Sequence, residues 1–307
     1  MPIEWPIWKT AGCGFFFPCN RSWKARAPRA WPRHCHAFSA TRWIFDPKTD
    51  RPMGKVFKYT LIDLARNRFV LGYALLMLAL AQGLFMLEDD AMKALLSLVQ
   101  VVLALVPLVT LVFTVVYLYD IQEFTQLLAV QPIGRRAIIS GQLLALASAL
   151  LVAQGLGLGL PLLVHAPFRS AVVLSLAGSA LVLVFAALGA LIALRQRDKA
   201  RGVGIALVLW LLFVLVYDAL LLWLMFMTSE YPVEPFVVPL AALDPIDLAR
   251  ILVMLEIDLA AMMGYSGAVY KSFFGSATGM AMAALILVLW ILLPAWGALR
   301  AFRKKDL

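Results

Sequence analysis

Residues 94–119 read ALLSLVQVVLALVPLVTLVFTVVYLY and contain no charged side chain. An α-helix rises about 1.5 Å per residue, and about 20 residues therefore cross a hydrocarbon core of about 30 Å. In lipid every backbone amide must form its hydrogen bond within the segment, which a continuous apolar run of this length achieves only as a helix. The stretch therefore predicts a membrane-spanning α-helix.

Runs of similar length and composition occur on both sides of this stretch. Five more meet the length needed to span a bilayer: 69–87, 143–164, 171–194, 203–227 and 277–299. The whole chain of 307 residues is 63% hydrophobic and 15% charged, whereas soluble domains average about 45–50% and about 25%. This composition excludes a soluble enzyme and predicts an all-α polytopic membrane protein with six transmembrane helices.

The basic residues predict how these helices are oriented. From residue 53 onward, fourteen Lys and Arg flank the spans on one side and four on the other. Loops rich in Lys and Arg stay in the cytoplasm. We therefore expect a multi-pass protein of the cytoplasmic (inner) membrane with both termini in the cytoplasm. The net charge of +9 is explained by this topology together with a basic N-terminus, and no nucleic-acid partner is expected.

The first 52 residues differ from the rest of the chain. They hold nine Lys and Arg against three Asp and Glu, and they show no helical or alternating period. We interpret 1–52 as a non-native or disordered extension and 53–307 as the six-helix transmembrane domain, with Met53 as the native start. The extension contains all the cysteines, Cys13, Cys19 and Cys35, but their spacing is not that of a zinc site.

Motifs for catalysis are missing from the sequence. It contains no G-x-x-x-x-G-K-[ST] phosphate loop, no H-E-x-x-H and no G-x-S-x-G, and His165 is the one histidine after residue 53. We therefore expect no catalytic residue, no metal site and no cofactor in this chain.

Two polar residues stand out within the predicted spans. Asp218 is the only acidic residue inside an apolar run, and a charge there costs at least about 2.5–3.5 kcal/mol, so it should face protein or water. It is either a substrate-path, proton or helix-interface residue, or a structural aspartate of the bundle. Gln154 is expected to form an interhelical hydrogen bond. The run GLGLG at 155–159 permits close helix approach or a kink.

The loop between the second and third spans, 120–142, contains a short predicted helix. Its apolar face consists of four side chains: Phe124, Leu127, Leu128 and Val130. Pro132 and Gly134 end the helix. An exposed apolar helix is costly unless it rests on the bilayer or binds a partner.

The outer segment 228–276 is acidic, with six Asp and Glu against two basic residues. Asp244 as N-cap, Pro245 at the first helical position and Asp247 two residues later predict a helix start. The apolar residues that follow have helical spacing, so an amphipathic helix should lie at the outer membrane surface or re-enter the membrane. Asp244, Asp247 and Arg250 are candidate contacts for a periplasmic partner.

Several of these segments resemble one known family. Six spans, cytoplasmic termini, a helical first cytoplasmic loop and a long outer segment resemble ABC-2-type permeases. The segments KARGVG (199–204), LWLLFVLVYD (209–218), LDPIDLAR (243–250) and PIGR (132–135) are similar to the permease subunits of nitrous-oxide reductase maturation transporters. That family usually carries an acidic residue followed by Gly-Thr in the loop helix, whereas here Glu123 is followed by Phe124 and Thr125.

The resemblance implies a type V exporter-like permease that pairs with a second copy. A separate cytoplasmic ABC ATPase, which binds the ATP and Mg²⁺, would dock on the helix at 123–132. The implied coupling residues are Glu123, Phe124, Thr125, Leu127, Leu128, Pro132 and Arg135. The complex would transport a substrate or transmit force, possible roles including copper-site maturation of nitrous-oxide reductase. Alternatives are an ABC-2 exporter of another substrate (a drug, ion, lipid or polysaccharide), a scaffold for periplasmic proteins, and a secondary transporter using Asp218.

Overall fold

A computed structural model describes residues 52–88, 90–130, 134–227, 240, 243–256 and 277–304. All of them belong to one compact unit, Phe45–Leu307. The predicted extension, apart from its last residue, and the predicted coupling residue Pro132 lie outside the described residues.

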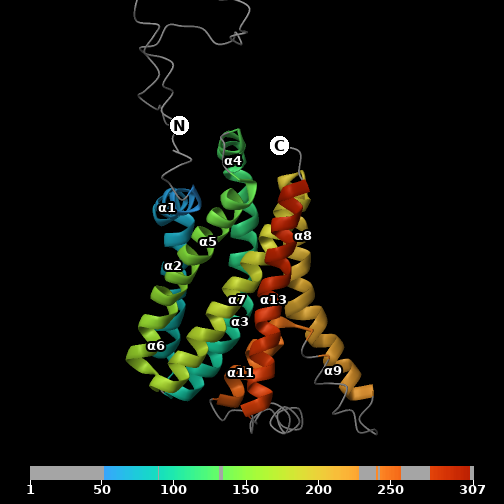
Figure 1. Cartoon of the computed structure of the whole chain (residues 1–307). Helices are drawn as coiled ribbons and strands as arrows, with labels where there is room; N and C mark the ends of the chain where they lie inside the picture. Colours follow the sequence, from blue (N-terminus) through green and yellow to red (C-terminus); the bar gives the residue numbers. More distant parts are fainter. Residues whose placement is uncertain are drawn as a thin grey trace, which may run out of the picture. The chain divides into compact units, whose positions relative to one another are not determined.

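The described residues form helices and no strand (Figure 1). Two short π-helical segments, η3 and η4, interrupt the third and fifth spans. In chain order the elements are α1 (Pro52–Ala65), α2 (Arg68–Leu87), α3 (Ala91–Asp120), α4 (Gln122–Ala129), α5 (Arg135–Gln154), η3 (Gly155–Gly159), α6 (Leu160–His165), α7 (Phe168–Arg195), α8 (Lys199–Leu211), η4 (Leu212–Val216), α9 (Tyr217–Met227), α11 (Pro245–Glu256) and α13 (Ala277–Lys304).

Six helical stretches are long and apolar enough to cross a membrane, which confirms the predicted all-α membrane fold. They are Arg68–Leu87, Ala91–Asp120, Arg135–His165, Phe168–Arg195, Lys199–Leu224 and Ala281–Phe302. The third begins at Arg135, eight residues before the predicted start at 143, because Ile138 and Ile139 are buried and extend the helix beyond the apolar run. The predicted loop 120–142 is therefore largely helical.

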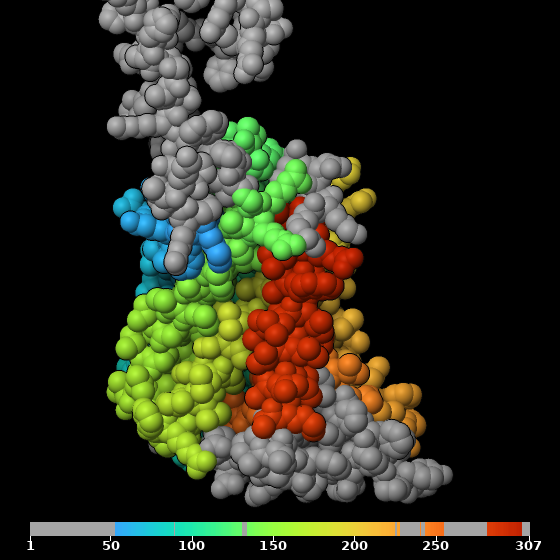
Figure 2. All heavy atoms as spheres, viewed as in Figure 1, coloured from blue at the N-terminus to red at the C-terminus, as the bar shows by residue number. Residues whose placement is uncertain are grey.

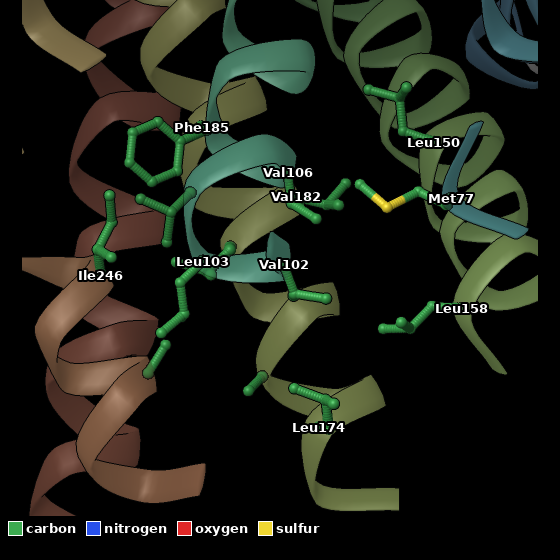
Figure 3. Close-up of a cluster of buried hydrophobic side chains, with 14 of the residues drawn as sticks. Met77, Val102, Leu103, Val106, Leu150, Leu158, Leu174, Val182, Phe185 and Ile246 are labelled. Atoms are coloured by element: carbon green, nitrogen blue, oxygen red, sulfur yellow. The ribbon is translucent and has the colours of Figure 1, made fainter. Parts of the chain in front are cut away.

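Helices α3 and α7 form the centre of the bundle. α7 packs against α3, α13, α11 and α5, and α3 also packs against α8 and α2. Figure 3 shows their buried side chains, among them Leu103 of α3 and Phe185 of α7, meeting Ile246 of α11. Glycine allows the two central helices to approach closely, since a Cβ at Gly189 of α7 would lie 2.9 Å from the carbonyl oxygen of Leu111.

Gly157, the central glycine of the run 155–159 in the third span, also allows a close helix approach. A Cβ at Gly157 would lie 2.7 Å from the carbonyl oxygen of Ala74 and from the Cβ of Met77, both in α2. This confirms the close helix approach expected from 155–159. A π-helical turn at this position is typical of sites where a helix adapts to a neighbour or to a function.

The two ends of the bundle differ in the elements they carry (Figure 1). At one end, here called the basic end, lie α1, α4 and the C-terminal end of α13, together with Arg135, Arg136, Arg195 and Arg197. α6 and α11 lie at the opposite end. Along the face seen in Figure 2, α13 forms a continuous exposed column between them.

Helix α1 was not anticipated from the sequence. Val56 and Leu64 are buried, and α1 packs mainly against α5. Its apolar residues recur at helical spacing, a pattern that was available in the sequence but lies next to the atypical first 52 residues.

Candidate functional site

Helix α4 lies at the basic end and is held by its inner face. Thr125 and Leu128, three residues apart, are both buried. Leu128 belongs to a small apolar cluster with Val56 of α1 and Ile138 of α5. This cluster fixes α4 to the start of the third span and to the N-terminal helix.

A buried hydrogen bond adds to this attachment. The Nε2 of Gln142, in α5, donates to the Oγ1 of Thr125 at 2.8 Å, and that hydroxyl donates to the carbonyl oxygen of Ile121 at 3.0 Å. The Oε1 of Gln142 is buried without a hydrogen-bond partner. Gln142 and Phe302 of α13 both line a cavity of about 30 Å³, large enough for one water. Sequence reasoning missed Gln142 because it falls in a predicted loop.

The outer face of α4 is apolar and exposed. Phe124 is 45%, Leu127 69% and Val130 86% exposed. The four-residue apolar face expected from the sequence is therefore divided, with Leu128 turned inward and the other three outward. Glu123 and Arg135 are also exposed at this end, on the first turns of α4 and α5.

The segment KARGVG joins α8 to the end of α3, beside α4. Lys199 Nζ lies 2.6 Å from Asp120 Oδ1. The hydroxyl of Tyr119 donates to the carbonyl oxygen of Gln196 at 3.2 Å. A Cβ at Gly202 would lie 2.9 Å from the Tyr119 ring. These contacts give the segment a structural role at the basic end.

A second cluster joins α9 to α11. Arg250 Nη1 lies 2.8 Å from Asp247 Oδ1 and 3.1 Å from Asp218 Oδ2. The side chains of Asp247 and Arg250 are 7% and 17% exposed, and that of Asp218 is 38% exposed. The structure thus brings together the intramembrane aspartate and the outer-segment charges, which the sequence analysis had treated separately. Arg250 is one of two basic residues in the outer segment, and this scarcity was the signal available.

Asp244 completes this cluster and begins α11. Its Oδ1 accepts a hydrogen bond from the Ile246 amide at 2.8 Å, as expected of an N-cap, while its buried Oδ2 has no partner. Burial and the neighbouring Asp247 raise the pKa of Asp244 to about 8. Burial raises the pKa of Asp247 to about 6, although Arg250 lowers it and Asp218 raises it further.

Helix α11 packs into the end of the bundle instead of lying on its outside. Ile246, Leu248, Ala249 and Val253 are buried, and the helix contacts α7, α13 and α3. Its apolar residues therefore pack inside the bundle, while Asp247 and Arg250 pair with each other and with Asp218. Asp244 and Asp247 are buried against their own chain, and their predicted contact with a periplasmic partner stays a prediction.

Gln154 forms an interhelical contact in the core. The hydroxyl of Tyr73 in α2 donates to Gln154 Oε1. The Nε2 of Gln154 would lie 2.8 Å from a Cβ at Gly178, so glycine makes room for the amide. Within the part of the chain that the structure describes, no group of three or more His, Cys, Asp or Glu side chains is placed to hold a metal ion.

Comparison with known proteins gives the class. No family model matches the chain. It is 29% identical over 258 residues to the probable ABC transporter permease protein NosY of Stutzerimonas stutzeri, covering 77% of this chain and 90% of that protein. It is 30% identical over 226 residues to the protein of the same name from Pseudomonas aeruginosa, covering 66% of this chain and 82% of that protein.

These relatives and the six-span helical bundle define a permease subunit of an ABC transporter, embedded in a membrane by several spans. Within that class, the chain belongs to the NosY family of ABC transporter permeases. The segments 199–218 and 243–250, on which the resemblance was based, carry Lys199, Gly202, Asp218, Asp244, Asp247 and Arg250, whose contacts are described above.

Proposed function

We propose that this chain is the membrane half of an ATP-driven complex in which a separate cytoplasmic ABC ATPase docks on α4. The observation that carries the proposal is the exposed apolar face of Phe124, Leu127 and Val130, held outward by the buried Thr125 and Leu128. Exposed apolar side chains grouped on a rigid helix are typical of a surface that contacts another protein.

The distribution of Lys and Arg supports the side of the membrane on which this docking would take place. The basic end carries most of the Lys and Arg, and this excess favours a cytoplasmic position for α4, where ATP is available. The proposed localisation is the cytoplasmic (inner) membrane, with both termini in the cytoplasm. ATP and Mg²⁺ would bind to the ATPase chain, and movement of its two halves would be passed through α4 to α5 and α1.

A second permease copy is part of the proposal, because one ATPase dimer would offer two docking surfaces. The complex would either transport a substrate or transmit force to a periplasmic accessory protein at the opposite end. The resemblance at 199–218 and 243–250 favours a role in nitrous-oxide reductase copper-site maturation. A proton-coupled transporter is less supported, since Asp218 forms an ion pair with Arg250.

The proposal is tested by co-purification of the full chain with a cytoplasmic ABC ATPase co-expressed from the same organism. Leu127→Asp, placed on the exposed face, should lower ATPase recovery at least about tenfold, because a charge would enter an apolar contact. Arg197→Asp is the matched control: it places the same charge at another exposed site at the basic end and should retain the ATPase. Equal recovery with both variants would contradict docking on α4.

A further inference from the structure

Arg66 and Arg68 flank the junction of α1 and α2, and Lys58 lies about two turns earlier in α1. Lys58, Arg66 and Arg68 are exposed and have no ion-pair partner among the described residues. The nearby carboxylate of Asp63 accepts a hydrogen bond from the Tyr117 hydroxyl at 3.0 Å. This corner therefore carries an excess of positive charge at the basic end of the bundle.

An apolar groove begins at the same corner. It has a volume of about 530 Å³ and runs between α2 and α3, and one residue each of α5 and α8 completes its lining. Its lining includes Gly72 and Leu76 of α2, Val109 and Val112 of α3, and Leu207 of α8. Among the described residues that line it, Arg68 is the only charged one, and Phe69 beside it is largely exposed.

An occupant of this site must match two chemistries at once. The groove offers almost no polar group, so it favours a hydrocarbon chain, whereas the corner above it favours an anion. Basic clusters at the cytoplasmic end of a membrane span attract anionic lipid headgroups.

We propose that the groove binds an anionic phospholipid of the cytoplasmic leaflet, with its phosphate at Arg66 and Arg68 and one acyl chain along Gly72 and Leu76. The assignment to this leaflet rests on the orientation given under the proposed function. The lipid would fill the space between α2, α3 and α8 on the half of the bundle nearest α4.

A second copy of the chain is the main competing occupant, and the charges disfavour it. A twofold interface brings the same surface of each subunit together. Two copies meeting at this corner would place Lys58, Arg66 and Arg68 opposite an identical excess of cations. An anionic headgroup neutralises these charges instead.

The test is native mass spectrometry of the full-length purified protein with phosphatidylglycerol or phosphatidylcholine of identical acyl chains. The protein should retain phosphatidylglycerol several-fold more than phosphatidylcholine. The double variant Arg66→Gln/Arg68→Gln should lower phosphatidylglycerol retention at least about fivefold. The double variant Arg195→Gln/Arg197→Gln, which removes two exposed cations at another corner of the same end, should change it by less than about twofold.

A second variant tests the groove itself. Gly72 lines the groove and a Cβ there meets no atom within 4 Å, so Gly72→Phe should extend its ring into the groove and lower retention of both lipids. Gly72→Leu replaces it if the larger variant aggregates. Unchanged retention in the arginine and glycine variants would overturn the proposal, as would a change in oligomeric state on Gly72→Phe with lipid retention intact. ATPase recovery is measured separately, so a failure of docking on α4 is distinguishable from a failure of lipid binding.

Discussion

Helices α4 and α11 are both short, of 8 and 12 residues, and lie at opposite ends of the bundle, yet they distribute their side chains in opposite ways. α4 exposes Phe124 and Leu127 and uses a buried threonine for attachment. α11 buries its apolar residues, and its charged groups turn toward α9. A helix that leaves apolar side chains exposed is suited to contact another surface, whereas one that buries them holds its own bundle together.

Removing the cation of the α11 cluster should lower the stability of the protein more than any other change considered for these two helices. Arg250→Met should lower the free energy of unfolding by about 3 kcal/mol or more, because the buried Asp247 would lose its partner. The measurement is the thermal unfolding midpoint of the purified protein in detergent. Asp218→Asn is the control and should cost much less, since Asp218 is partly exposed. Equal stability of Arg250→Met and the unmodified chain would show that the cluster does not hold α11.

The two helices should also differ in how much stability is lost when one of their leucines is shortened. Leu248→Ala in α11 should lower the free energy of unfolding by about 2–3 kcal/mol, because a fully buried side chain leaves a cavity. Leu127→Ala in α4 should change it by less than about 0.5 kcal/mol, because that side chain is exposed. The same thermal measurement checks both. Similar losses of unfolding free energy at the two positions would mean that α4 and α11 do not differ in how they bury their leucines.

The pH dependence of stability should come from α11. The pKa of Asp244 in the folded chain, about 8, lies above its ordinary value of 3.8, so the folded state binds the proton more tightly than the unfolded state. This contribution is complete below about pH 4 and is lost as the pH rises through about 8. Asp244→Asn, which keeps an N-cap side chain, should raise stability at pH 8.5 on the order of 1–2 kcal/mol relative to the unmodified chain.

The control for this effect is the same pair of proteins at pH 3.5, where the carboxyl of Asp244 is largely protonated in both the folded and the unfolded chain. The two should then unfold at nearly the same temperature. A difference that is equal at pH 3.5 and pH 8.5 would mean that Asp244 does not titrate as a buried carboxyl.

The spans could be predicted from the sequence because each is a continuous apolar run whose length alone decides the structure in a bilayer. The N-cap at Asp244 was also predictable, since it depends on a local pattern of Asp followed by Pro. The loop 120–142 was extended too far because the start of α5 is polar, and tertiary packing of Ile138 and Ile139 overrides that polarity.

The ion-pair cluster could not be predicted, because Asp218 and Arg250 are 32 residues apart and no local rule connects them. Nor could the division of the α4 face, since helical spacing alone allows Leu127 and Leu128 to share one side. Only the position of α1 and α5 decides that Leu128 is buried. At both ends of the bundle, the contacts that sequence reasoning could not predict are those between segments distant in the chain.

The smallest expected effect concerns how α4 is attached. Gln142→Leu removes the hydrogen bond to Thr125 and should cost about 1 kcal/mol, because the threonine hydroxyl keeps its bond to the Ile121 carbonyl. A double-mutant cycle with Thr125→Val should give a coupling energy of about 0.5–1 kcal/mol. ATPase recovery should stay unchanged, because Phe124 and Leu127 still face outward. A coupling energy near zero would leave Leu128 and its apolar neighbours as the whole attachment, and α4 would then be held, like α11, by packing.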